Sequence, residues 1–219
     1  MAGGKLLDAL PEHSVSNSMQ EALTHIKSAD PVLARIIDEA GPYLIEFQEP
    51  DFEALAKSII YQQLSGRVAA VIFNRVAAAA GGGKLTADGL LKLRMNKLRA
   101  AGLSRQKIEY LRGVARRTVS GDLDFESLGA LADSEVCRRL TEIKGIGVWT
   151  AQMFLIFALR RHNVMPSADL GIRVAVRKAY GLVETPKPAE VDELAKRWHP
   201  WCTVASWYLW RSLGDKAGM

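Results

Sequence analysis

The chain has 219 residues, which is enough to bury one core or two small ones. Hydrophobic residues make up 48% and charged residues 24%, as is ordinary for a soluble globular protein, and the formal net charge of +5 favours polyanionic partners weakly. No apolar run approaches the ~20 residues of a membrane span, and the first residues lack the apolar core of a secretory signal. We therefore expect a soluble intracellular protein.

The cysteines and histidines give no sign of a metal site. Cys137 and Cys202 are the only cysteines, so a four-cysteine zinc or iron–sulfur site is excluded, and two distant thiols suit a reducing compartment. The four histidines show no ligand-like spacing: His13, His25, His162 and His199. We expect no metal held by side chains.

The predicted elements are helices from one end of the chain to the other. Residues 1–14 are predicted to form a disordered tail. Helices are then expected over 30–41 (capped by Asp30, with Pro31 in the first turn), 51–64, 65–83, about 90–93 and 97–100, 104–122, 134–143 (capped by Ser134), 148–160, 167–181 (opened by Ser167 or Asp169), 189–198 and from Pro200 to 214. No stretch alternates with period two for long enough to form a strand. The predicted fold class is all-α.

Two glycines separate the helix that ends near Ile143 from the helix that begins at Val148. Gly145 and Gly147, around Ile146, let the backbone turn tightly and remove side chains from the surface of the turn. The first N–H groups of the following helix have no intrahelical partner, and the helix dipole favours an anion there. A DNA phosphate fits such a site, and an ordinary corner between two helices is the alternative.

The stretch "LTEIKGIGVWTA" (residues 140–151) resembles the hairpin of the helix-hairpin-helix DNA glycosylase superfamily. That family also carries an aspartate about twenty residues after the residue that precedes the hairpin threonine. Here Trp149 precedes Thr150, and Asp169 lies twenty residues beyond Trp149. Two further segments, "SIIYQQLSGRVAAVIFNRV" and "HPWCTVASWYLW", are similar to the alkylation-repair branch, 3-methyladenine DNA glycosylase II. The resemblance covers roughly residues 50–212, with its motifs in the family's order.

Two positions differ from the family pattern in an informative way. Lys144 stands where the family usually has proline, which leaves an N–H in place and adds a charge near the expected phosphate. Trp149 stands where bifunctional members carry the lysine that attacks the sugar and drives strand cleavage. The resemblance therefore implies an enzyme without lyase activity.

The resemblance makes Asp169 the candidate catalytic residue. Breaking an N-glycosidic bond gives the sugar oxocarbenium character, and a nearby carboxylate stabilises that charge and orients or deprotonates the attacking water. A purine alkylated at N3 or N7 is already cationic, so it leaves without a strong general acid. The alternative is that Asp169 only caps its helix, as aspartate often does.

A base that reacts at Asp169 has to leave the DNA stack and enter a pocket. By resemblance, Trp149 and Trp210 line this pocket, because an electron-poor alkylated purine stacks well on aromatic faces. Met153 and Leu170 stand where longer relatives have tyrosines. We therefore expect a thinner stacking surface, which leaves the range of lesions open.

A wedge has to fill the gap that the base leaves behind. The turn Gln62–Gln63–Leu64–Ser65 matches the family's wedge segment, and Gln63 or Leu64 is the candidate plug. The alternative for Gln62 or Gln63 is that its amide satisfies buried backbone groups.

Basic side chains concentrate in one part of the sequence, where Glu109 is the only acid. They are Lys92, Arg94, Lys97, Arg99, Arg105, Lys107, Arg112, Arg116 and Arg117. We expect two or three of them to contact phosphates and the others to form a solvated face. Ser104 and Arg105, at the start of a helix, are the candidates for contact, together with Lys144, Gly145, Gly147 and Thr150 of the hairpin.

The resemblance implies a two-lobed helical fold with a cleft between the lobes. A central lobe over 51–161 would carry the hairpin, and 15–50 together with 162–219 would form the flanking lobe. The implied enzyme is a monofunctional, monomeric glycosylase that excises 3-methyladenine and 7-methylguanine from double-stranded DNA, in the nucleoid of a bacterium or the nucleus of a eukaryote. It needs no cofactor, although a monovalent cation, Na⁺ or K⁺, is expected as an optional ligand of the hairpin main-chain carbonyls. The alternatives are a non-catalytic binder of damaged DNA, a monofunctional glycosylase for another lesion, and a helical protein–protein module.

Overall fold

The computed structural model describes residues 12–214, and within them the regular structure is helical, with no strand. The elements are α1 (Glu12–Ala29), α2 (Pro31–Ala40), α3 (Phe52–Tyr61), α4 (Gly66–Ala79), α5 (Ala87–Lys92), α6 (Met95–Ala100), α7 (Arg105–Ser120), α8 (Phe125–Gly129), α9 (Asp133–Thr141), α10 (Val148–Phe157), α11 (Leu170–Ala179), α12 (Pro188–Ala195), the short 3₁₀ helix η1 (Lys196–Trp198) and α13 (Cys202–Arg211). The predicted all-α class is confirmed. None of the described helices is both long enough and apolar enough to cross a membrane.

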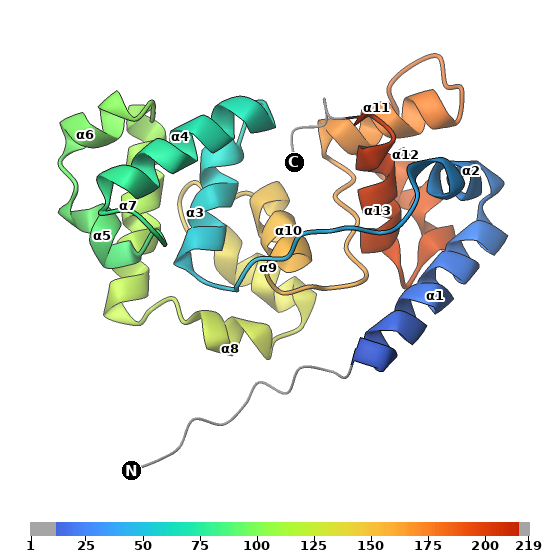
Figure 1. Cartoon of the computed structure of the whole chain (residues 1–219), viewed down its shortest axis with the longest axis horizontal. Coiled ribbons are helices and arrows are strands. Elements are labelled where there is room, and N and C mark those ends of the chain that lie inside the picture. The colour runs from blue at the N-terminus through green and yellow to red at the C-terminus, as the bar shows by residue number, and fades with distance from the viewer. Residues whose placement is uncertain (1–11, 215–219) are drawn as a thin grey trace, which may run out of the picture.

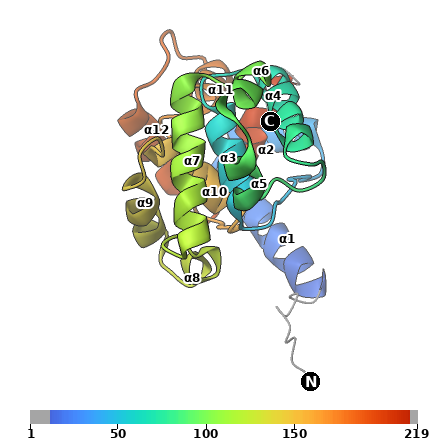
Figure 2. The same cartoon turned by 90° about the vertical axis from the view of Figure 1, so that its left-hand side faces the viewer.

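The helices gather in two groups, which lie side by side in Figure 1. In one group α3 packs on α4, α7 and α10, while α9 packs on α10 and α5 on α7. In the other group α13 packs on α2 and α11, and α1 packs on α2. Figure 2 shows α7 in front of α3 on the outer side of the first group. We propose that these groups are the two lobes, with the boundaries given above.

The chain passes between the two groups twice, and the two passages are joined to each other. The first passage is the extended stretch 41–51 after α2, and the second is 158–169 between α10 and α11. The Gln48 N–H donates to the Phe157 carbonyl at 2.8 Å, at the point where α10 ends. The second passage ends at Asp169, so the candidate catalytic residue lies where the chain re-enters the second group.

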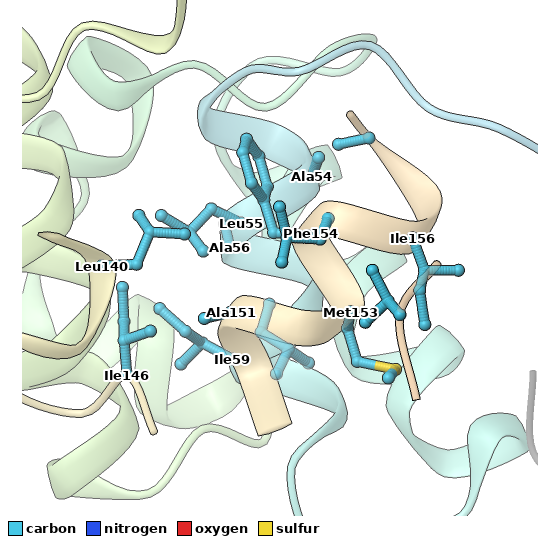
Figure 3. Close-up of a cluster of buried hydrophobic side chains, with 14 of the residues drawn as sticks. Ala54, Leu55, Ala56, Ile59, Leu140, Ile146, Ala151, Met153, Phe154 and Ile156 are labelled. Atoms are coloured by element: carbon cyan, nitrogen blue, oxygen red, sulfur yellow. The ribbon is translucent and has the colours of Figure 1, made fainter. Parts of the chain in front are cut away.

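The core of the first group surrounds α10, which is apolar on all sides and largely buried. Figure 3 shows Phe154 and Ala151 of α10 among Leu55 and Ile59 of α3, with Ile146 beside them. Burying one such large side chain contributes about 1.5–3 kcal/mol to folding. The glycine hairpin is therefore anchored by Ile146, between the two glycines, while its backbone stays at the surface.

Several helix ends differ from the predicted ones. The predicted tail 1–14 is too long, since residues 12–14 belong to α1; residues 1–11 lie outside the described part of the chain. The predicted cap Ser134 is wrong: the N-cap is Ala132, two residues earlier, and α9 begins at Asp133. The last helix begins at Cys202 rather than at Pro200. The predicted Asp30 cap is confirmed: its carboxylate accepts from the N–H groups of Val32 and Leu33, with Pro31 first in the helix.

Candidate active site

Asp169 is the N-cap of α11, and its carboxylate is held from three helices. Oδ1 accepts the Ile172 N–H at 2.8 Å, which is the capping bond expected of an aspartate at this position. The same oxygen accepts the Trp210 indole N–H of α13 at 2.9 Å, and Oδ2 accepts the Trp149 indole N–H of α10 at 2.8 Å. The cap and the candidate catalytic group are therefore the same side chain.

The number of hydrogen-bond donors on the Asp169 carboxylate determines how many further ligands it can accept. An ionised carboxylate offers about four lone-pair positions. Oδ1 uses two of them and Oδ2 uses one. One lone pair of Oδ2 is left for a water or for a cationic atom.

Gly171 makes room for this arrangement. A Cβ added at Gly171 would lie 2.9 Å from Asp169 Oδ1 and 3.2 Å from Trp210 Cδ1. The first distance is shorter than real Cβ contacts and the second is unusually tight, so a side chain here would displace the carboxylate and crowd the indole. Gly171 was not among the site residues predicted from the sequence, where its only signal is a glycine just inside the helix that Asp169 opens.

The four predicted pocket residues differ in how much surface they offer a ligand. Trp149 is half-buried, whereas Trp210 is 4% exposed and stacks on Phe157 with ring centroids 6.1 Å apart. Met153, one turn after Trp149, is 5% exposed and lies in the core (Figure 3), and Leu170 is 66% exposed. Of the two tryptophans, Trp149 therefore has more free surface.

The hairpin requires its two glycines for different reasons. Gly145 has φ +97°, and an added Cβ would lie 2.0 Å from Cγ of Tyr110, so both the backbone and the neighbouring ring demand glycine. Gly147 has an ordinary φ of −92°, with nothing within 4 Å of an added Cβ. It is the N-cap of α10 and makes no side-chain capping bond, so the first N–H groups of α10 face outward without a cap. Only Gly145 is needed for the turn itself, and Gly147 leaves the helix end open.

Gln62 joins the predicted wedge turn to the hairpin. Its amide Nε2 donates to the Gly145 carbonyl at 2.9 Å and to Thr150 Oγ1 at 2.8 Å. Thr150 is 1% exposed, so its side chain supports the hairpin from below and offers no surface for DNA. The predicted contact between Thr150 and DNA is therefore corrected: the buried side chain bonds Gln62 instead. Gln62 takes the alternative role that the sequence left open, bonding a backbone carbonyl.

Gln63, Leu64 and Ser65 project from the surface at the wedge turn. Gln63 has φ +57°, which is uncommon for a residue other than glycine, and its side chain is exposed. Leu64 is 37% exposed, and Ser65 precedes α4 without a side-chain capping bond. The two candidate plug residues are therefore both free to reach outward.

An open cavity of about 460 Å³ lies between the hairpin, the wedge turn and the start of α7. It is lined by Gln62, Gln63, Ser104, Gln106, Lys107, Tyr110 and residues 141–147. Six of the predicted DNA-contact residues thus border one hollow. Ser104 caps α7 by accepting the Lys107 N–H at 3.1 Å, and Arg105 beside it is exposed.

Three side chains of the basic stretch donate to backbone carbonyls. Arg99 donates to the Leu103 carbonyl and Arg112 to the Leu93 carbonyl, at 3.0 and 2.6 Å. Lys107 donates to two further carbonyls, and burial lowers the pKa of its amine. Arg99 is exposed despite its bond, as are the other six: Lys92, Arg94, Lys97, Arg105, Arg116 and Arg117.

The chain is similar to known DNA repair proteins. The model of the HhH-GPD superfamily, base excision DNA repair proteins, matches residues 56–200. The chain belongs to this superfamily. The resemblance drawn from the hairpin and the Trp149–Asp169 spacing is confirmed, and a protein–protein module that merely carries a glycine turn no longer explains the pattern.

Members with high similarity cover nearly the whole chain. DNA-3-methyladenine glycosylase 1 of Schizosaccharomyces pombe is 34% identical over 94% of this chain and 92% of its own length. The solved structure of the S. pombe 3-methyladenine DNA glycosylase Mag1 in complex with abasic DNA superposes with a TM-score of 0.83 at 35% identity, covering 88% of this chain and 96% of that one. A DNA-3-methyladenine glycosidase from Bacillus halodurans superposes with a TM-score of 0.75 at 36% identity, covering 89% of each chain.

A solved structure at lower identity shows a likeness of fold alone. An 8-oxoguanine glycosylase/lyase from Clostridium acetobutylicum superposes with a TM-score of 0.74 but is 20% identical. Within the described residues, no group of three or more His, Cys, Asp and Glu side chains could hold a metal ion, and Cys137 and Cys202 are free thiols.

Proposed function

We propose that this protein is a monofunctional DNA glycosylase of base excision repair. Its substrates would be alkylated purines of the 3-methyladenine and 7-methylguanine type, flipped out of double-stranded DNA. The relatives of similar length at 34–36% identity are named as 3-methyladenine enzymes, which supports the lesion class. The observation that carries the proposal is the Asp169 carboxylate, oriented by two indole N–H groups with one lone pair left free.

The proposed reaction is hydrolysis at the C1′ carbon of the damaged nucleotide. The bond between C1′ and the base nitrogen breaks, and the base takes the bonding electrons, which neutralises its positive charge. Water adds its oxygen to C1′ and loses a proton to Asp169 or to solvent. The carboxylate stabilises the positive charge that develops on the sugar, a contribution worth about 3–4 kcal/mol in comparable electrostatic sites.

The absence of an amine in this site supports the monofunctional reading. Trp149 stands at the position from which a lysine attacks the sugar in bifunctional members, and its indole nitrogen donates to Asp169 and has no nucleophilic lone pair. The product would therefore be an abasic site in unbroken strands.

DNA would cross the face on which the hairpin, the wedge turn and the start of α7 meet. A phosphate would bind the uncapped N–H groups at the start of α10, beside Lys144. Gln63 or Leu64 would fill the space of the flipped base, and the base would lie against Trp149. The enzyme would act as a monomer in the compartment that holds the DNA, nucleoid or nucleus.

The reaction as written needs no cofactor. A monovalent cation, Na⁺ or K⁺, would be an optional ligand of the hairpin carbonyls, which are neutral oxygens of the kind such ions accept. Gly145 O and Ile143 O each carry one internal hydrogen bond, from Gln62 and from the Ile146 N–H, and a carbonyl oxygen has a second lone pair to offer.

Two alternatives make different predictions. A non-catalytic binder of damaged DNA would retain the phosphate-binding hairpin and release no base. A monofunctional glycosylase for another lesion would release a different base at the same carboxylate. The free lone pair on Asp169 and the names of the full-length relatives favour the alkylpurine enzyme over both.

The test is release of free base from duplex DNA that carries radiolabelled methyl groups. We expect 3-methyladenine and 7-methylguanine in the supernatant, and strands that stay intact until hot alkali cleaves the abasic sites. Strand breaks without alkali would contradict the monofunctional assignment. Binding without release of any methylated base would contradict the substrate class, and a panel of duplexes with ethenoadenine and hypoxanthine would then separate the two alternatives.

A further inference from the structure

Lys107, in the first turns of α7, holds the end of α3 and the wedge turn that follows it. Its ammonium donates to the Ile60 carbonyl and to the Gln62 carbonyl, both at 2.7 Å. These carbonyls belong to the C-terminal end of α3, where carbonyls lack intrahelical partners and the dipole favours a cation. The side chain is half-buried, and burial lowers the pKa of the amine, so the ammonium is kept there at some cost in solvation.

Besides the Lys107 bonds, the wedge turn is held by the Leu64 N–H, which donates to the Tyr61 carbonyl at 3.2 Å, and by the Gln62 amide. Gln63 adopts a left-handed conformation that is unfavourable for a glutamine, and such a conformation persists only where the surroundings enforce it. The Gln63 and Leu64 side chains are exposed, and Ser65 makes no side-chain capping bond to α4. The two Lys107 bonds lie directly before Gln63 and fix the backbone from which it projects.

The Lys107 bonds are also connected to the hairpin, through Gln62. Lys107 fixes the Gln62 carbonyl, while the Gln62 amide bonds the Gly145 carbonyl and Thr150 Oγ1. Two surface loops more than eighty residues apart in the chain are thus tied through one glutamine. Figure 2 shows α7, which supplies Lys107, in front of α3.

We propose that Lys107 is a positioning residue for base flipping. Its ammonium sets the wedge turn at a fixed place relative to the phosphate-binding hairpin, so that Gln63 and Leu64 enter the duplex at the nucleotide whose base faces Asp169. This inference rests on the proposed function of the same site. Lys107 itself touches no reacting atom, and its effect passes through the turn.

Removing the Lys107 bonds would change the rate of base excision. Displacing a positioning group by about 1 Å can slow a reaction about 100-fold. A loosened wedge lowers the fraction of time that the base spends flipped, whereas contacts from Arg105, Lys144 and the hairpin to the DNA backbone remain. The excision rate should fall while affinity for undamaged duplex stays nearly constant.

The experiment uses the full chain with Lys107→Met, which keeps a long stem and removes every N–H donor. Lys107→Arg restores donors and charge. Lys196→Met removes an exposed lysine that lies away from α7 and forms an ion pair with Glu193, three residues earlier. Each variant is assayed below its Tm for single-turnover base release from methylated duplex. Unstacking is followed by 2-aminopurine placed opposite the lesion, and affinity for undamaged duplex is measured at two salt concentrations.

For Lys107→Met we expect release at least 10-fold slower per folded molecule, a weaker 2-aminopurine signal, and affinity and salt dependence within twofold of wild type. Lys107→Arg should recover part of the rate, and Lys196→Met should match wild type. If Lys107→Met does not fold, Lys107→Gln, which keeps one amide donor, should show the same separation of rate from affinity.

The inference would be overturned if Lys107→Met or Lys107→Gln released base at the wild-type rate with the wild-type 2-aminopurine signal. A loss of affinity with a shallower salt dependence would also overturn it, because Lys107 would then be a phosphate contact. Failure of the wild-type protein itself to release a methylated base would instead contradict the proposed function.

Discussion

At the residue scale, the orientation of the Asp169 carboxylate depends on one backbone and two indole N–H groups. Each bond to a carboxylate is charge-assisted, and such bonds contribute about 1.5–3 kcal/mol. Trp149 and Trp210 come from different helices, so the carboxylate has one orientation only when α10, α11 and α13 are packed correctly.

Trp149→Phe tests the role of the indole N–H. Phenylalanine keeps an aromatic face for the base and removes the donor to Asp169 Oδ2. We expect single-turnover base release to fall about 10-fold or more, in line with the loss of one charge-assisted bond. An unchanged rate would show that Trp149 serves only as a stacking surface.

Gly171→Ala separates activity from stability. A methyl group at this position meets Asp169 Oδ1 and Trp210, so base release should drop at least 10-fold. Alanine favours the helix by about 0.5–1 kcal/mol over glycine. This gain offsets part of the steric strain, so the Tm should change less than the activity. Gly113→Ala is the matched control, since that helical glycine has open space around it, and its activity should equal wild type. Loss of activity in both variants would contradict the steric argument.

At the scale of elements, the hairpin between α9 and α10 combines a buried anchor with an open helix end. Ile146 packs in the core, while Gly145 and Gly147 on either side carry no side chain. The two glycines should therefore respond differently to alanine.

Gly145→Ala should destabilise the protein by about 2–4 kcal/mol, because its φ is left-handed and the new methyl group overlaps Tyr110. Gly147→Ala should leave the Tm within a few degrees and weaken binding to abasic duplex, because its methyl group stands over the open N-terminus of α10. Thermal unfolding and fluorescence titration measure the two effects. Equal losses of stability in both variants would contradict the account.

The sequence predicted local features of these elements better than distant ones. The Asp30 cap and the glycine hairpin depend on groups a few residues apart, which a sequence pattern shows directly. The bond from Trp210 to Asp169 spans forty-one residues and depends on how α13 packs on α11. Thr150 was predicted to contact DNA because the hairpin pattern contains it, and the pattern did not reveal that its side chain is buried.

At the scale of the whole molecule, exposed positive charge should set how binding depends on salt. Each phosphate that a basic side chain neutralises adds about 0.9 to the slope of log K against log salt. Arg105→Ala, next to the cavity at the start of α7, should lower this slope by about one. Arg117→Ala lies twelve residues further along the same helix, about 18 Å away, and should leave the slope unchanged. A wild-type slope for Arg105→Ala would show that DNA does not cross the start of α7.

The arrangement of the two helix groups explains why Asp169 can serve as the centre of the site. Its chain neighbours α10 and α11 belong to different groups, and the α10–α11 connection brings the carboxylate to the place where they meet. One group supplies the hairpin, the wedge turn and Trp149. The other group supplies Trp210 and the N-terminus of α11, which Asp169 caps.

Base release from methylated duplex DNA by wild type and by Asp169→Asn is the most direct test of the central claim. Asparagine keeps the N-cap acceptor, so the variant should fold and bind abasic duplex like wild type, with a lower Tm because its amide nitrogen cannot accept the Trp149 N–H. Its single-turnover rate should fall about 100- to 1,000-fold, because a neutral amide does not stabilise the cationic sugar. A rate within a few fold of wild type would contradict the assignment of Asp169 as the catalytic carboxylate.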